Sequence, residues 1–118
     1  MGYDLHIVRR QNWFDEDATK DISLQEWVNY VNGDADMRLD NYAAATTIEG
    51  EKTITVSEGL SVWTAYSKDG INGNHAWFGY YEGCIAVKNP DDEIIKKMVE
   101  ISIKLNAKVQ GDDGEFYR

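Results

Sequence analysis

The chain has 118 residues, 42% hydrophobic and 28% charged, which indicates one soluble globular domain over residues 1–118. Its 21 acidic and 12 basic residues give a net charge of −9, which disfavours nucleic acid and membrane surfaces as partners and would attract a basic protein. The same acidity would also serve solubility alone. Cys84 is the only cysteine, and no signal peptide or membrane-spanning run is evident, so we expect a cytoplasmic protein without disulfides.

The first predicted strand covers residues 3–10. Alternating side chains should give it one buried face and one wetter face. The first face carries Tyr3, Leu5 and Ile7, and the second carries Asp4, His6 and Val8. Residues 11–21 show no period and contain Trp13 and Phe14, which predicts a loop pinned by its two rings.

A short helix is predicted from Ser23. Ser23 and Glu26 have the spacing of a capping box, and Ile22 and Trp27 have the spacing of a hydrophobic staple. Asn32-Gly33 is a natural end for this helix. Residues 34–50 show no decisive pattern, so they receive no assignment.

The chain returns to β structure after residue 51. Residues 52–56 and 60–66 are predicted to pair with each other as antiparallel strands around Glu58-Gly59. Residues 68–74 contain two turn dipeptides, Asp69-Gly70 and Asn72-Gly73, and predict a surface loop.

Residues 75–88 predict the central β-hairpin, with Glu82-Gly83 as its two-residue loop. That loop sets Gly79 opposite Ala86. The face expected in the core carries Ala76, Phe78, Tyr80, Ile85 and Val87. The other face carries large rings around a small-residue dip at Gly79 and Ala86. The dip either seats the second helix, which we favour, or stays open.

The second helix is predicted to begin with Asn89 as its N-cap and Pro90 at its first position, and to end at Asn106. A last strand follows at residues 107–110. The order of elements predicts an α+β fold, with an antiparallel-rich sheet of about five to six strands and two helices packed on one face.

No catalytic or metal-binding constellation is recognisable. His75 should lie far from Cys84 along the hairpin, and the two histidines and one cysteine lack zinc-ligand spacing. We therefore expect Cys84 to be a buried structural thiol and the protein to be neither an enzyme nor a cofactor or metal carrier. The run from Gly111 to Glu115 reads as a tight turn or as a rigid acidic prong for a cationic partner.

Four groups of residues near the two ends of the chain are distinctive: Tyr3-Asp4-Leu5-His6-Ile7 with Arg9 and Trp13, Ile22-Ser23-Leu24 with Glu26-Trp27, Val87-Lys88-Asn89-Pro90-Asp91, and Val109-Gln110-Gly111-Asp112-Asp113-Gly114-Glu115 with Tyr117. In these segments the chain resembles a family of small bacterial proteins, some of which are similar to the immunity proteins paired with bacterial toxins. Residues 34–74 carry none of it. The resemblance implies a bacterial cytoplasmic protein and brings no catalytic residues with it.

The sequence thus predicts a non-catalytic binding protein, most concretely an immunity protein that occludes the active site of a toxin with a basic surface. The residues expected to contact that partner are Asp112, Asp113, Glu115, Trp77, Tyr81 and Asp69. The alternative is a small-molecule-binding or enzymatic domain with an aromatic pocket around His75, Trp77 and Tyr81. A third possibility is self-association through the aromatic sheet face.

Overall fold

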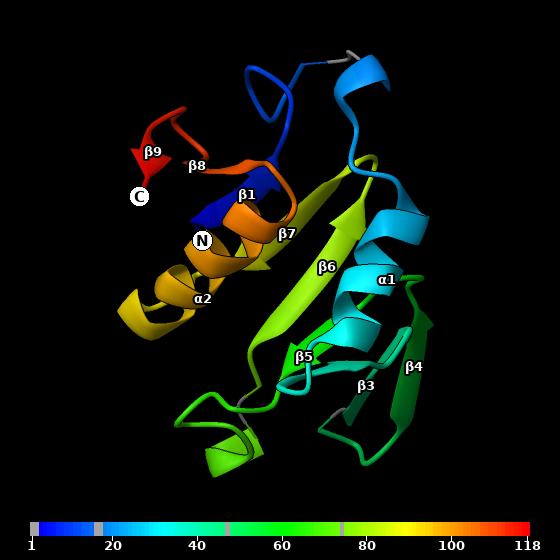
Figure 1. The fold of residues 1–118 in the computed structure, drawn as a ribbon. Helices are drawn as coiled ribbons and strands as arrows, with labels where there is room; N and C mark the ends of the chain where they lie inside the picture. Colours follow the sequence, from blue (N-terminus) through cyan, green and yellow to red (C-terminus); the bar gives the residue numbers. More distant parts are fainter. Residues whose placement is uncertain (1–2, 16–17, 47, 74) are drawn as a thin grey trace.

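The computed structural model describes residues 3–15, 18–46, 48–73 and 75–118, which build a seven-stranded antiparallel sheet with two helices over one face (Figure 1). The strands in spatial order are β2 (Met37–Leu39), β5 (Ser61–Trp63), β6 (Trp77–Tyr81), β7 (Cys84–Lys88), β1 (Asp4–Val8), β8 (Lys108–Gly111) and β9 (Phe116–Tyr117). The other elements are the helices α1 (Leu24–Gly33) and α2 (Asp92–Lys104), the separate hairpin of β3 (Tyr42–Thr46) and β4 (Lys52–Val56), and short 3-10 turns at Ala18–Lys20 and Ile71–Gly73. The predicted α+β class is confirmed, with slightly more strands than expected.

The central hairpin forms as the sequence predicts. Glu82 and Gly83 both adopt positive φ, 45° and 85°, as a type I′ turn requires. That turn sets Gly79 opposite Ala86, which confirms the predicted register. Every further strand of the sheet is added outward from this pair.

An apolar cluster of described residues fills the space between the sheet and the helices. Its buried members include Leu5, Ile7, Trp27, Val31, Phe78, Ile85, Val87, Met98, Ile101 and Val109. Trp27 stacks on Phe78 with 6.5 Å between ring centroids, so α1 is anchored to the middle of the sheet. The hairpin face that we expected in the core is therefore the one under the helices.

Helix α1 begins as its capping residues predict. The Glu26 amide donates to Ser23 Oγ at 3.1 Å, and the Ser23 amide donates to the Glu26 carboxylate at 3.2 Å. Ile22 and Trp27 are both buried, as a hydrophobic staple requires. Local sequence therefore fixes this helix start.

Helix α2 begins two residues later than predicted, with Asp91 as its N-cap. The Asp91 carboxylate accepts the Ile94 amide at 2.9 Å. Asn89 instead takes a left-handed φ of 46°, and its side chain accepts the Tyr3 amide at 2.7 Å. The preferred capping residue is thus used to tie down the first strand. The predicted left-handed end at Asn106 is confirmed, with φ at 54°.

The predicted pairing of residues 52–56 with 60–66 is wrong. Strand β4 pairs with β3, and β5 lies between β2 and β6. The Ser57 amide donates to the Asn41 carbonyl at 2.9 Å, and the Asn41 side chain accepts the Gly59 amide at 3.0 Å. These bonds return the chain to the base of β3, so it continues into the main sheet instead of doubling back on β4.

Helix α2 does not occupy the dip at Gly79 and Ala86, so that expectation is wrong as well. The helix lies over β1 and β8, on the opposite face of the sheet, where Met98 and Ile101 are buried. The apolar stripe of α2 is buried against these two strands. The dip is left uncovered by either helix.

Candidate functional site

The face of the sheet without helices, which we call the open face, carries the candidate site. Its side chains come from alternate positions of the central strands and are Asp4, His6, Trp77, Gly79, Tyr81, Cys84, Ala86, Lys88 and Gln110. A Cβ atom added at Gly79 would meet only the Ala86 carbonyl oxygen at 3.8 Å and Leu60 at 3.9 Å. The dip therefore has room for an added group.

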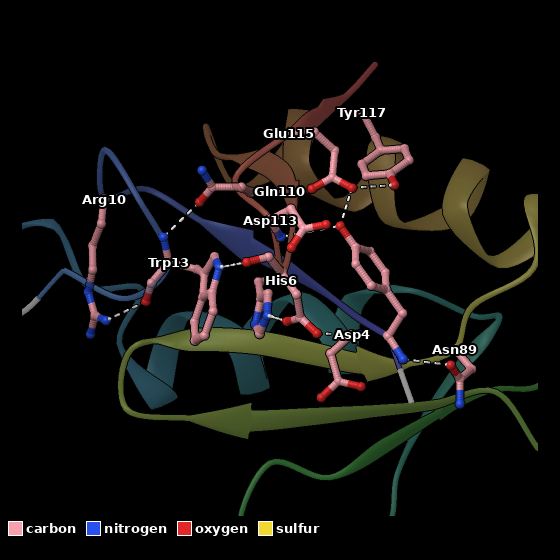
Figure 2. A network of polar contacts seen from close by, with 11 residues as sticks. Asp4, His6, Arg10, Trp13, Asn89, Gln110, Asp113, Glu115 and Tyr117 are labelled. Carbon is pink, nitrogen blue, oxygen red and sulfur yellow. Dashed lines mark hydrogen bonds and ion pairs between the residues drawn. The ribbon is translucent and has the colours of Figure 1, made fainter. Parts of the chain in front are cut away.

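One end of the open face is covered by the loop that follows β1. Trp13 from this loop lies flat on His6, with 4.3 Å between ring centroids and 4° between ring planes (Figure 2). The Trp13 indole donates to the Asp112 carbonyl at 3.3 Å. His6 is consequently buried, which corrects the expectation of a wetter face on this strand.

The Asp112 carboxylate is the hydrogen-bond partner of the His6 ring. The distance from His6 Nε2 to Asp112 Oδ1 is 2.8 Å, and the Asp4 amide donates to Asp112 Oδ2 at 2.9 Å. Burial opposes the charged form of Asp112, but these two hydrogen bonds and the charge of His6 lower its pKa. Asp112 therefore remains an anion and fixes the histidine ring.

Gln110 is the second anchor of the loop and is fully buried. Its Oε1 accepts the Trp13 amide at 2.7 Å, and its Nε2 donates to Asn12 Oδ1 and to the Gly114 carbonyl, each at 3.1 Å. Within the described ranges, no buried side-chain nitrogen or oxygen lacks a hydrogen-bond partner. The open face is thus closed at this end by a satisfied polar network.

Arg10 ties the same loop to the hairpin turn. Its Nε donates to Asp21 Oδ1 at 2.8 Å, and its other nitrogens donate to the carbonyls of Trp13 and Glu82. The Ile22 amide also donates to the Gly83 carbonyl at 2.9 Å. The guanidinium is therefore a structural clamp.

Between the loop and the hairpin turn lies a hollow of about 640 Å³, which we call the His6 hollow. It is lined by Asp4, His6, Arg10, Trp13, Phe14, Asp15, Asp21, Tyr81, Glu82, Cys84 and Ala86. Four of these residues are acidic, Arg10 carries a positive charge, and His6 is bound to Asp112. Phe14 and Tyr81 are 60% and 70% exposed, so two rings stand free at a concave acidic site.

A smaller hollow of about 230 Å³ lies further along the open face, beside His75 and Trp77. His75 Nδ1 lies 2.9 Å from Asp69 Oδ1, and its ring meets the edge of Trp77 at 5.6 Å. Tyr81 lines the His6 hollow and is not part of this one. The three residues of the predicted aromatic pocket are therefore divided between two hollows.

The turn between β8 and β9 contains the other predicted contact residues. The Tyr3 and Tyr117 hydroxyls both donate to Glu115, and the bond from Tyr3 is the main reason that the pKa of Glu115 is lowered. The same bond raises the pKa of Tyr3 to about 12. Glu115 and Asp112 thus have internal partners, whereas the neighbouring Asp113 is an exposed residue.

Cys84 is buried, as predicted, and burial raises the pKa of its thiol. A raised pKa disfavours the thiolate, the reactive form. In the described residues no group of three or more His, Cys, Asp or Glu side chains is placed to hold a metal ion. Over the same ranges neither helix has the length and apolar character needed to cross a bilayer.

Sequence reasoning overlooked the lining residues Asp4, Arg10, Phe14, Asp15 and Glu82. The only sequence signals for the His6 hollow were the two rings of the loop and the polar residues of the first strand. Comparisons with protein-family models, with curated proteins and with solved structures find no match to this chain. The fold and the open face define the class of protein: an α+β sheet protein with one helix-covered face and one acidic, ring-bearing face.

Proposed function

We propose that the chain is a binding protein that recognises a basic protein surface through the His6 hollow and the adjoining open face. The observation that carries this proposal is the concave site with four acidic side chains and the exposed rings of Phe14 and Tyr81. Aromatic anchors beside acidic groups suit a partner of opposite charge. The net charge of −9 would steer the same encounter at long range.

The most concrete form of this function is that of an immunity protein, which covers the active site of a cognate toxin inside the producing cell. Support comes from the acidic character and from the resemblance at both ends of the sequence. Trp77 on the open face and the exposed Asp113 in the turn between β8 and β9 are proposed as further contacts. Asp69 is proposed as well, although it is already paired with His75. Asp112 and Glu115 would contribute mainly by holding the turn in shape, because both already have internal partners.

Co-purification with the protein encoded by the neighbouring gene tests the proposal. The expected result is a stable complex, together with toxicity of the neighbour when it is expressed alone. Phe14→Ala combined with Tyr81→Ala should weaken the complex at least tenfold, since anchor rings carry much of the energy of an interface. The control is Ile103→Ala, an exposed apolar residue of α2 on the helix side. A harmless neighbour that forms no complex would refute the function.

The second candidate is a small-molecule-binding domain, and the volume of the His6 hollow favours it. Ligand pockets occupy roughly 300–1,000 Å³, so the His6 hollow has a suitable size and the hollow beside His75 and Trp77 is too small. Native mass spectrometry of the freshly purified protein discriminates between the two candidates. A stoichiometric bound metabolite that is lost in Tyr81→Ala would favour the small-molecule function.

A further inference from the structure

We propose that the His6 hollow seats one arginine side chain of the partner, against Phe14 and Tyr81 and beside the carboxylates of its rim. This inference rests on the proposed binding function and specifies the group that is recognised. Three observations carry it: the charge that remains after internal pairing, the exposure of the rings, and the fixed position of the wall.

The charge that remains in the hollow is negative. Arg10 and Asp21 neutralise each other, with 2.6 Å between a guanidinium nitrogen and the carboxylate. Asp15 and Glu82 line the hollow and form no ion pair among the described residues. Asp4 forms none there either, although Lys88 stands opposite it on the neighbouring strand. Among the residues drawn in Figure 2, none is bonded to the Asp4 carboxylate. A cationic group that enters the hollow therefore meets carboxylates that form no internal ion pair.

The exposed rings favour a cation that can stack. Phe14 lies 5.6 Å from Trp13 with 86° between the ring planes, so the two rings do not stack on each other, and the Phe14 ring is largely exposed. Tyr81 extends from the last position of β6 beside the turn. A guanidinium is planar, stacks on aromatic faces and binds carboxylates in a bidentate manner, whereas an ammonium ion offers only a point charge. The hollow therefore suits arginine better than lysine.

The wall of the hollow is held in place before any partner arrives. Trp13 is fixed by His6, by Gln110 and by the Asp112 carbonyl, and Arg10 fixes the turn from the other side. A site held in advance loses less conformational entropy when it binds. Asp4 and Glu82 also lie on opposite sides of the hollow, one on β1 and the other in the β6–β7 turn.

Titration of the full chain by NMR, with the Trp13 indole N–H resonance as reporter, tests this inference. The probes are N-acetyl-arginine amide, the lysine equivalent, and the citrulline equivalent, which is neutral and nearly isosteric with arginine. We expect saturable shifts with arginine, weaker binding of lysine, and no saturable binding of citrulline. Tyr81→Ala and Glu82→Gln should each weaken arginine binding roughly three- to fivefold, and Ile103→Ala should leave it unchanged.

Equal binding of arginine and citrulline, or shifts that map to His75 and Trp77 instead of Trp13, would overturn the inference. If methylguanidinium binds as tightly as the arginine amide, the hollow is a site for a small free cation. That result would overturn the proposal that it binds an arginine side chain of a protein partner. The outcome is separable from the function above. A neighbour that co-purifies while the arginine probe fails refutes only the arginine seat, and a probe that binds without any protein partner refutes only the immunity function.

Discussion

The two faces of the sheet are built by different physical means, although every central strand contributes to both. The covered face is apolar and is held by burial, with Phe78, Ile85 and Val109 fully buried under the helices. The open face is polar and is held by directed bonds, with Gln110 equally buried but engaged in three hydrogen bonds. Burial alone therefore does not distinguish core from site. The distinction lies in whether the buried group requires specific partners.

The largest expected effect of a substitution belongs to the covered face. Phe78→Ala removes a fully buried ring that stacks on Trp27, and should lower the free energy of unfolding by about 3–5 kcal/mol. Urea denaturation measures this change. The matched control is its neighbour on the open face: Gly79→Ala has room for the added methyl and should change stability by less than about 0.5 kcal/mol. Similar losses for both variants would contradict the division into two faces.

The next effect concerns the buried amide of the open face. Gln110→Leu keeps the side chain close to its size but leaves the Trp13 amide, the Asn12 side chain and the Gly114 carbonyl without this partner, and should lower stability by about 2–3 kcal/mol. The Trp13 indole resonance should also move, because its loop loses an anchor. Gln25→Leu, on the exposed side of α1, is the control and should be nearly neutral. An unmoved Trp13 would show that Gln110 does not hold the loop.

The third effect is the dependence of stability on pH at Asp112. Its pKa is lower in the folded chain than the value of about 3.9 in the unfolded chain. The stabilisation is therefore fully present above pH ~5 and is lost as the pH falls through 4 and below. Asp112→Asn should lower stability by about 1 kcal/mol at pH 7 and flatten the curve between pH 5 and pH 3. The matched control is Asp113→Asn, which removes the same charge at the adjacent exposed residue.

The contrast between the faces also explains what could be predicted from the sequence. Periodicity and capping residues identify the covered face, the hairpin register and the start of α1, because each of these depends on residues close in sequence. The predicted start of α2 was wrong because the Asn89 side chain accepts the Tyr3 amide instead of capping the helix. The predicted partner of β4 was wrong because Asn41 binds the Gly59 amide and directs the chain into the main sheet. Both misassignments come from side chains whose partners lie far away in sequence.

The candidate site was harder to predict for the same reason. Its lining is drawn from the first strand, the loop after it and the hairpin turn, with Asp112 supporting His6 from the far end of the chain. Tyr81 was expected to contact a partner and does line the hollow, but no local pattern singled out Phe14 or Glu82. The acidic turn was interpreted either as a tight turn or as a rigid acidic prong, and the carboxylates of Asp112 and Glu115 have internal partners.

The smallest expected effect on stability is at Tyr81, and it gives the sharpest test of whether the second face is open. Tyr81 lies on the same strand as Phe78, but it is 70% exposed and should carry little folding energy. Tyr81→Ala should therefore change the free energy of unfolding by less than about 0.5 kcal/mol in urea denaturation, while it weakens partner binding. A loss above about 1.5 kcal/mol, the range of a buried group, would mean that the ring packs internally. The hollow would then be part of the core, and neither a basic protein nor an arginine side chain could use it.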